Sequence, residues 1–293
     1  MFFRRLLLTL EMIKFEHSLF ALPFAMTATI LAWRSMGFPS TGMGWKVFWI
    51  VVAMVGARSA GMTFNRILDA DVDGKNPRTR MRHLPAGMLS GQFAWGFLIV
   101  SSIIFFGASW ELGSFCLKLA PVALGILFFY SFTKRFTSYS HLVLGFCLGV
   151  APGAAWIAVT GTLDPRILWL TAAVTFWTAG FDIIYSCQDY EFDSSSPLFS
   201  LPKQLRIAGA LLISRFLHVA MIGCLVALLL SFHLGWLSWL GITGVAGLLI
   251  YEQSLVKASD LSRVDAAFFT VNGYVSVLFL IFWAADVYFS HWA

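Results

Sequence analysis

The chain is a succession of long apolar runs separated by short polar breaks. A transmembrane helix needs about 20 apolar residues, and nine runs meet or approach that length, at residues 18–33, 47–66, 92–110, 117–131, 141–160, 167–187, 208–231, 235–252 and 266–288. We therefore predict an all-α polytopic membrane protein, with about nine transmembrane helices around a central cavity and a cytoplasmic loop cap. Nine spans with short connections use up the length, so we expect residues 1–293 to form a single domain.

The composition supports placement in lipid. The sequence is 59% hydrophobic and 12% charged, and its mean hydropathy is +0.79, whereas a soluble domain carries about 25% charged residues. The formal net charge is +5, but the Lys and Arg residues form no cluster interleaved with exposed aromatic residues, as nucleic-acid binding would require. We expect a lipid bilayer as partner and no nucleic acid.

The distribution of basic residues predicts the orientation of the chain. If nine spans alternate in direction, fifteen Lys and Arg residues fall on the side of the N-terminus and four fall on the other side. Cytoplasmic loops of membrane proteins carry the basic excess, so we predict a cytoplasmic N-terminus. The two longest connections, residues 67–91 and 188–207, then both lie on the cytoplasmic side.

The second apolar run ends in a stripe of polar residues. Asn65, Asp69 and Asp73 are spaced at i, i+4 and i+8, and four residues advance a helix by about 400°, so the three side chains share one face. Asp71 points elsewhere.

The sixth apolar run ends in a similar stripe. Asp189 and Asp193 repeat the spacing of Asp69 and Asp73 after 120 residues. We expect Asp182 to share their face, with Tyr185 one turn before Asp189.

Two matched acidic stripes at cytoplasmic helix ends predict a metal site. Neighbouring carboxylates repel one another unless positive charge lies between them, and Mg²⁺ suits carboxylate, amide and phosphate oxygens together with retained waters. Two stripes of this kind would hold a diphosphate through bridging metal ions. Solvated helix ends, where Asp is common, would explain one stripe but do not account for two with the same spacing.

The sequence resembles the UbiA-type intramembrane prenyltransferases over nearly its whole length. The family's first signature, N-x-x-x-D-x-x-x-D, is matched by the first stripe, and its second, D-x-x-x-D, by Asp189 and Asp193. Further matching stretches are Ile13-Lys14-Phe15-Glu16-His17, Asn76-Pro77-Arg78-Thr79, His83-Leu84-Pro85-Ala86-Gly87, Tyr130-Ser131-Phe132-Thr133-Lys134-Arg135 and Asp260-Leu261-Ser262-Arg263-Val264-Asp265.

The resemblance implies an enzyme that transfers a polyprenyl chain from polyprenyl diphosphate to a 4-hydroxybenzoate-like aromatic acid in quinone biosynthesis, with Mg²⁺ as cofactor. A multi-pass protein of the bacterial inner (cytoplasmic) membrane is then expected. The implied catalytic residues are Asp69, Asp73, Asp189 and Asp193, which together with Asn65 would bind the metal. The implied substrate-binding residues are Asn65, Arg58, Arg66, Lys134, Arg135, Tyr130, Asp182 and Tyr185.

Arg58 has two interpretations. An arginine inside an apolar span is costly unless it faces a polar cavity or a partner. It would bind either the carboxylate of the acceptor or a structural partner such as Asp182.

The sequence departs from the family pattern after Asp193. Relatives usually continue with basic residues and Gly, whereas Pro197 and Phe199 stand at such positions here. The second diphosphate contact then depends on Lys203 and Arg206 as replacements.

Two alternatives remain open. The acceptor could be a dihydroxynaphthoate of menaquinone synthesis. In a different class, intramembrane carboxylates also mark ion-coupled transporters, although transporter sites tend to lie near the bilayer midplane and these carboxylates cluster at one edge.

Overall fold

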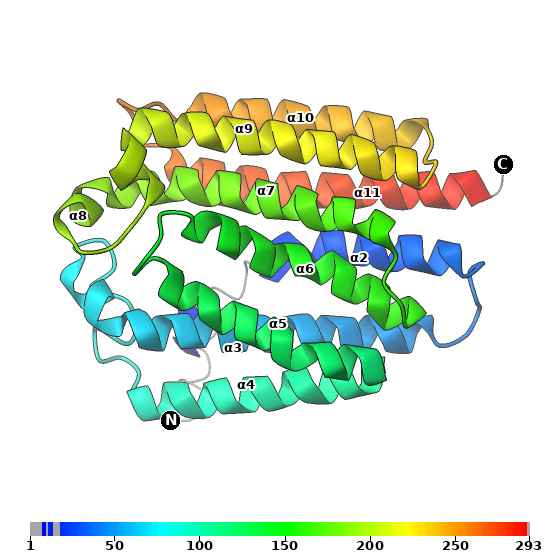
Figure 1. The fold of residues 1–293 in the computed structure, drawn as a ribbon, viewed down its shortest axis with the longest axis horizontal. Coiled ribbons are helices and arrows are strands. Elements are labelled where there is room, and N and C mark those ends of the chain that lie inside the picture. The colour runs from blue at the N-terminus through cyan, green and yellow to red at the C-terminus, as the bar shows by residue number, and fades with distance from the viewer. Residues whose placement is uncertain (1–7, 10, 14–17, 292–293) are drawn as a thin grey trace. The chain divides into compact units, whose positions relative to one another are not determined.

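The computed structural model describes residues 8, 9, 11–13 and 18–291 (Figure 1). Within these residues the regular structure is helical, apart from an isolated bridge between Lys257 and Asp260, so the predicted all-α class is confirmed. The long helices are α2 (Ser18–Ser35), α3 (Met43–Lys75), α4 (Gly91–Leu112), α5 (Ser114–Thr133), α6 (Ser140–Thr160), α7 (Leu168–Ser186), α9 (Leu201–Ser231), α10 (Trp236–Leu255) and α11 (Asn272–His291). Shorter elements are η2 (Pro165–Ile167), η3 (Cys187–Asp189), α8 (Tyr190–Ser195) and the π-helical η4 (Ala266–Val271). Residues 14–17, in the first of the stretches that resemble the family, lie outside the described residues.

Each predicted span overlaps one of these long helices, although α9 begins seven residues before its predicted span and shortens the predicted connection 188–207. In the described part of the chain, seven helical segments are long and apolar enough to cross a membrane. Helices α2 and α10 are not among them, so the count of nine spans stays a prediction.

Helix α3 extends further than its apolar run. The predicted span ends at residue 66, whereas α3 continues to Lys75, so the predicted connection from residue 67 begins only at residue 76. On this extension Asp69 and Asp73 are buried, with Asn65, Arg66 and Arg82 as polar neighbours.

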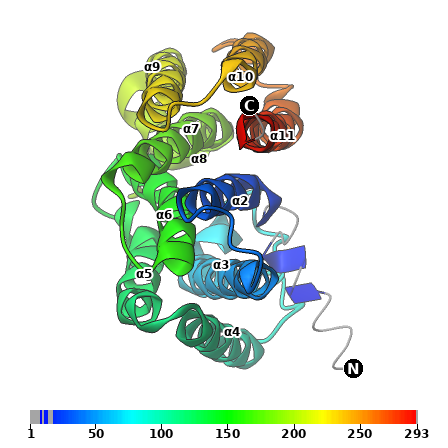
Figure 2. The same cartoon turned by 90° about the vertical axis from the view of Figure 1, so that its right-hand side faces the viewer.

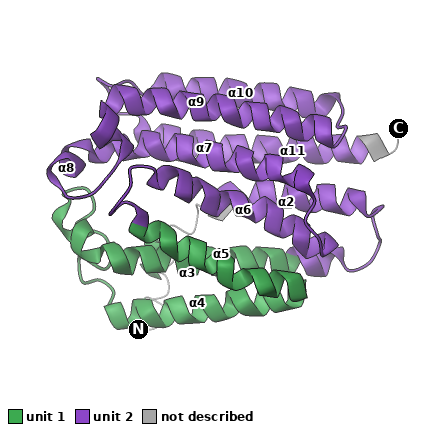
Figure 3. Ribbon diagram, in the orientation of Figure 1, with its two compact units in different colours: residues 1–18, 48–132 green, residues 19–47, 133–293 purple. Residues whose placement is uncertain are grey.

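The chain forms two compact units, coloured separately in Figure 3. The first unit comprises residues 1–18 and 48–132, and contains most of α3 together with α4 and α5. The second comprises residues 19–47 and 133–293, and contains the remaining long helices. The single domain over residues 1–293 stays a prediction.

Small residues bring the helices of the first unit together. A Cβ atom on Gly56 of α3 would lie 3.0 Å from the backbone nitrogen of Phe105 on α4. Ala60, Phe105, Ala120 and Leu124 form the apolar core between α3, α4 and α5. The backbone approach at Gly56 fixes α3 against α4, because a larger residue would push the two helices apart.

In the second unit, α7 lies between α6 and α9 (Figures 1 and 2). Gly145, Gly149 and Gly153 recur every four residues on α6 and face α7. A Cβ on Gly149 would lie 2.6 Å from the carbonyl oxygen of Thr171, and one on Gly145 would overlap the carbonyl oxygen of Thr175. This is small-residue packing of the kind that lets membrane helices approach closely.

Buried polar residues on α11 satisfy the ends of neighbouring elements. The carboxylate of Asp286 accepts hydrogen bonds from the backbone nitrogens of Gly235 (2.6 Å) and Leu237 (3.2 Å) at the start of α10. Asn272 donates to the carbonyl oxygens of Ala267 and Phe268 in the π-helical turn. Asp286 therefore caps a helix, because the first N–H groups of a helix lack partners within it.

The connection from α10 to η4 is ordered by a turn. The carboxylate of Asp260 accepts a hydrogen bond from the backbone nitrogen of Ser262 (3.0 Å), and this bond holds the pKa of Asp260 below its usual range. Val256 and Val264 of the same connection are buried against Ile183 and Ile184 of α7. The stretch at 260–265 is thereby docked on the end of α7.

Candidate active site

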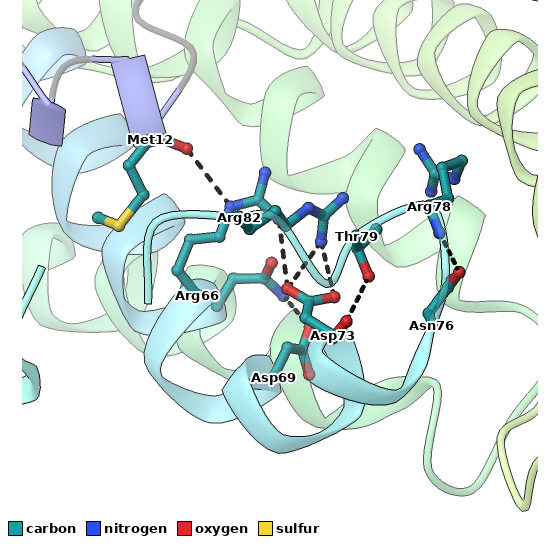
Figure 4. A network of polar contacts seen from close by, with 9 residues as sticks. Met12, Arg66, Asp69, Asp73, Asn76, Arg78, Thr79 and Arg82 are labelled. Carbon is teal, nitrogen blue, oxygen red and sulfur yellow. Dashed lines mark hydrogen bonds and ion pairs between the residues drawn. The ribbon is translucent and has the colours of Figure 1, made fainter. Parts of the chain in front are cut away.

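The first acidic cluster consists of Asn65, Asp69 and Asp73 on α3, and Figure 4 shows Asp69 and Asp73 with their surroundings. Asp69 and Asp73 are 2% and 5% exposed, whereas Asp71 between them is exposed. The orientation predicted from the four-residue spacing is therefore confirmed. The catalytic and metal-binding roles of these residues stay predictions.

Each carboxylate of the first acidic cluster has a fixed polar neighbour. The side-chain amide of Asn65 donates to Oδ2 of Asp69 over 3.1 Å. Nη1 of Arg82 donates to both carboxylate oxygens of Asp73, at 2.7 and 2.8 Å, and Nη1 of Arg66 lies 3.9 Å from Oδ2 of Asp73. Two guanidinium groups thus neutralise the buried carboxylate of Asp73, which burial alone would disfavour in its charged form.

Arg82 was not among the site residues predicted from the sequence. It lies in the connection between α3 and α4, which folds back as a series of turns: the hydroxyl of Thr79 donates to the carbonyl oxygen of Asp73 (3.0 Å), and the backbone nitrogen of Arg78 donates to the side chain of Asn76 (3.0 Å). Its nine-residue separation from Asp73 carries no helical periodicity, so only the folded turns reveal the contact.

Arg66 connects the first acidic cluster to two other segments of its unit. Its Nε donates to the carbonyl oxygen of Met12 over 3.4 Å. Tyr130, near the end of α5, lies within electrostatic reach of the Arg66 guanidinium, as do Asp69 and Asp73. The structure therefore gathers Arg66 and Tyr130, two predicted substrate-binding residues, around the first acidic cluster.

Arg58 lies two turns before Arg66 on the same helix and is half-buried. The two guanidinium groups are close enough to repel each other electrostatically.

The second acidic stripe does not lie on a continuous helix. Helix α7 ends at Ser186, and a 3₁₀ turn over Cys187–Asp189 precedes α8. The side chains of Ser186 and Cys187 both bond to the carbonyl oxygen of Ile183, and such local bonds compete with the helical ladder. The predicted common face of Asp182, Asp189 and Asp193 assumes a continuous helix, which this 3₁₀ turn interrupts, since it rotates successive residues by more than an α-helix does. Asp189 nevertheless lies within electrostatic reach of Asp193.

Asp193 is nevertheless surrounded by cations and a hydroxyl group. It accepts a hydrogen bond from the Ser200 side chain, and Lys134, Lys203 and Asp189 lie within electrostatic reach. Asp189, Asp193, Lys134 and Lys203 are called the second acidic cluster below. Arg135, the other predicted basic residue of this segment, follows Lys134 and is half-buried.

The altered loop after Asp193 is closed by Lys203. The ammonium of Lys203 donates to the carbonyl oxygens of Ser196 (2.7 Å) and Leu198 (2.9 Å), and the backbone nitrogen of Phe199 donates to the carbonyl oxygen of Lys134 (2.8 Å). Arg206 lies at a kink in α9, with φ 59° and ψ 167°, and is exposed. Of the two replacements considered for the missing loop cations, only Lys203 is within reach of Asp193.

Asp182 forms a pair that the sequence did not predict. Its Oδ2 lies 2.7 Å from Nδ1 of His141, at the start of α6. Both residues are shielded from solvent, with the side chains 19% and 6% exposed. Their separation of 41 positions carries no periodic signal, so the pairing depends on the contact of α6 with α7.

Tyr185 belongs to an aromatic cluster in the second unit. Its ring lies 4.3 Å from that of Phe268, which in turn contacts Phe181 (5.1 Å) and Phe20 (6.2 Å) between ring centroids. Trp177 completes the cluster at 5.0 Å from Phe181. Ring faces of this kind stabilise cations and pack against apolar chains.

The residues of the acidic clusters fit Mg²⁺. Among the described residues, no three His, Cys, Asp or Glu side chains converge tightly enough to hold a metal by themselves. Mg²⁺ does not require such a cage, since it binds one or two carboxylates and completes its shell with phosphate oxygens and water. Asn65, Asp69 and Asp73 offer amide and carboxylate oxygens of the required type.

These observations define a helical membrane protein whose acidic and basic side chains suit a metal-bound anion. The model of the UbiA prenyltransferase family matches residues 21–284, and the chain belongs to that family. It is therefore a prenyltransferase, and membership decides against the alternative of an ion-coupled transporter.

Similar proteins include named enzymes and solved structures. The chain is 30% identical over 245 residues to a 4-hydroxybenzoate octaprenyltransferase of Vibrio atlanticus, covering 80% of this chain and 83% of the relative. It is 33% identical over 227 residues to the enzyme of the same name from Tolumonas auensis, covering 75% and 77%.

A solved UbiA homologue from Aeropyrum pernix superposes with a TM-score of 0.81 at 31% identity, over 95% of this chain and 98% of that one. A UbiA homologue from Archaeoglobus fulgidus, bound to DMAPP and Mg²⁺, has a TM-score of 0.73 at 19% identity, over 96% and 99%. The second likeness concerns the fold alone.

Proposed function

We propose that the protein transfers a polyprenyl chain from polyprenyl diphosphate to 4-hydroxybenzoate or a closely similar aromatic acid, with Mg²⁺, in quinone biosynthesis. The names of the relatives from Vibrio and Tolumonas support this acceptor. The homologue bound to DMAPP and Mg²⁺ supports a metal-bound prenyl diphosphate as donor.

The observation that carries the proposal is the pair of buried carboxylates on α3, flanked by Arg66 and Arg82. Two carboxylates at 2% and 5% exposure are costly to bury, and a site that combines them with guanidinium groups is suited to bind a metal and a phosphate anion together. A purely structural ion pair would need one carboxylate, not a stripe with an oriented amide.

The chain's own residues would act on the diphosphate as follows. Mg²⁺, when bound, would neutralise the charge that develops on the diphosphate oxygens as the C–O bond breaks. Asn65 orients Asp69 through their hydrogen bond, which presents the remaining carboxylate lone pairs in a fixed direction. Arg66 supplies fixed positive charge for the leaving group.

The aromatic cluster suits the prenyl group. Departure of diphosphate leaves an allylic cation, which must be kept from water until the acceptor attacks. Tyr185 on α7 lies one turn before Asp189 in the chain, and its ring packs against that of Phe268 on η4, with the two centroids 4.3 Å apart. Cation–π attraction stabilises such a cation more strongly in a dry site than in solvent.

The acceptor side of the proposal rests on cations along α3 and after α5. An aromatic carboxylate requires a partner of opposite charge in a low-dielectric region. Arg58 is the first candidate, because it lies inside the span and is half-buried. Lys134 and Arg135 are the alternatives.

The test is a transfer assay with purified membranes. One radiolabelled polyprenyl diphosphate and Mg²⁺ are incubated with 4-hydroxybenzoate and with a dihydroxynaphthoate in turn, and the lipid-soluble product is measured. We expect label transfer to 4-hydroxybenzoate, and loss of transfer when EDTA removes the metal. Transfer to the naphthoate alone would replace the acceptor by the menaquinone precursor. No transfer to either would contradict the proposal.

A further inference from the structure

The Asp73–Arg82 contact places a cation on a predicted metal ligand. Both oxygens of the Asp73 carboxylate accept hydrogen bonds from Nη1 of Arg82, at 2.7 and 2.8 Å, and a second guanidinium nitrogen, Nη1 of Arg66, lies 3.9 Å away. The carboxylate is 7% exposed as a side chain. The negative charge of Asp73 is thus balanced by the guanidinium groups of Arg66 and Arg82, which Figure 4 shows beside it.

This balance opposes the binding of a free divalent cation. The two carboxylates of Asp69 and Asp73 and the two guanidinium groups of Arg66 and Arg82 sum to a formal charge of zero. Mg²⁺ alone would meet the repulsion of two nearby cations in a buried setting, where charges interact more strongly than in water. When Mg²⁺ arrives bound to a diphosphate, the negative charge of the diphosphate attracts the two guanidinium groups and offsets their repulsion of the metal.

The Arg82 side chain can bind a phosphate oxygen as well as a carboxylate. A guanidinium carries five N–H donors in a planar fork, and both contacts to Asp73 use one nitrogen, so donors remain for a second oxyanion. The side chain is 27% exposed, while its backbone is held by turns in the connection at 76–89. Arginine forks bind phosphate oxygens with the same geometry that they use for carboxylates.

We propose that Arg82 is a diphosphate-binding residue that exchanges Asp73 for the substrate: the guanidinium pairs with the Asp73 carboxylate, and transfers to the diphosphate oxygens when the metal–diphosphate complex takes up that carboxylate. The metal then enters together with the diphosphate and not before it. This inference rests on the proposed function, since it requires a prenyl diphosphate as ligand.

The exchange predicts effects of opposite sign in one variant. In Arg82→Gln, Asp73 loses the nearer of the two guanidinium groups that compete with a metal ion for its carboxylate. Mn²⁺ without diphosphate should therefore bind several-fold more tightly. The same variant loses a charge-assisted contact to the diphosphate, so a non-reactive prenyl thiolodiphosphate should bind about ten- to hundredfold more weakly in the presence of Mg²⁺. Mn²⁺ binding is read by electron paramagnetic resonance of the free ion, and analogue binding by calorimetry, both on detergent-purified protein.

The matched control is Arg80→Gln, which removes an exposed arginine two residues away on the same connection. It lowers the net charge by the same amount, so any effect that it shares with Arg82→Gln reflects general electrostatics. A second variant, Arg82→Lys, keeps a positive charge beside the Asp73 carboxylate and can be used if Arg82→Gln fails to fold. It should leave Mn²⁺ affinity close to that of the wild type and weaken analogue binding by a smaller factor.

The possible results separate the alternatives. Weaker binding of both Mn²⁺ and the analogue in Arg82→Gln would overturn the exchange, because Arg82 would then only hold Asp73 in the geometry that the metal needs. Unchanged binding of both, or equal effects of Arg80→Gln, would also overturn it. If wild-type protein does not bind the analogue with Mg²⁺, the proposed function fails, while the Mn²⁺ measurement still tests the competition at Asp73.

Discussion

Three aspartates within five residues of α3 have different environments. Asp69 and Asp73 are buried and Asp71 is exposed, because each residue turns a helix by 100° and a step of two residues crosses to the opposite side. The same residue type therefore serves as a candidate ligand at two positions and as a solvated side chain at the third. The contrast provides a control of equal size and charge.

We expect Asp69→Asn and Asp73→Asn to reduce prenyl transfer by at least two orders of magnitude, or to raise the required Mg²⁺ concentration steeply. Asn keeps the shape of the side chain but removes the negative charge that binds a hard cation. Asp71→Asn should change the rate less than about threefold. Initial rates across a Mg²⁺ series check this, and equal losses at Asp71 and Asp69 would contradict the helical-face argument.

Arg58 is testable through the two Michaelis constants. If it binds the acceptor carboxylate, Arg58→Met should raise the KM for the aromatic acid by about ten- to hundredfold and leave the KM for the diphosphate nearly unchanged. Arg58→Lys, which retains the charge, should recover part of the loss. Equal changes in both constants, together with a lower unfolding temperature, would identify Arg58 as a structural residue.

At the scale of elements, glycines decide which helices meet. Gly145 and Gly149 let α6 approach the backbone of α7 so closely that a Cβ would overlap carbonyl oxygens of α7. The approach also brings His141, at the start of α6, within 2.7 Å of Asp182. The packing of α6 on α7 thus forms the His141–Asp182 pair, which could not be predicted from the sequence of either helix.

We expect Gly149→Ala to lower the free energy of unfolding by about 1–3 kcal/mol, since overpacking forces the two helices apart. Gly153→Ala is the control, because its Cβ would meet the Thr171 hydroxyl at 3.4 Å, which is an ordinary contact. Thermal or denaturant unfolding in detergent micelles measures both. A Gly149→Ala protein as stable as Gly153→Ala would show that the helices relax without cost.

The geometry of the acidic motif that follows α7 also depends on the surrounding structure. The spacing of Asp189 and Asp193 repeats that of Asp69 and Asp73, but a 3₁₀ turn at Cys187–Asp189 interrupts the helix, and the following loop is closed by Lys203. One acidic motif lies on a continuous helix and the other is held by loop contacts. Equal spacing in sequence therefore does not give equal geometry.

At the scale of the whole molecule, the orientation in the membrane is a prediction from fifteen basic residues against four. Topology reporters fused after Lys134 and after Arg166 should report opposite sides, with Lys134 cytoplasmic. Reporters after His233 and after Lys257 test whether α10 crosses the membrane. Matching signals for the second pair would exclude α10 as a span and place the C-terminus on the side of the N-terminus.

The helical membrane class and the face on which Asp69 and Asp73 lie could be predicted from the chain alone. Both follow from local periodicity, because apolar length sets a span and a step of four residues returns to the same side of a helix. The family was indicated by matching motifs. The approximate ends of the long helices followed in the same way, except that α3 extends beyond its apolar run, where Asp69 and Asp73 are buried.

The contacts between side chains of separate elements could be seen only in the folded chain. Arg82 reaches Asp73 because turns at 76–89 fold the connection back on α3, and His141 reaches Asp182 because glycines let α6 pack closely on α7. Such contacts depend on loop geometry and helix packing, which leave no period in the sequence. The acidic motifs are therefore visible in the chain, whereas the cations that balance them emerge only when it folds.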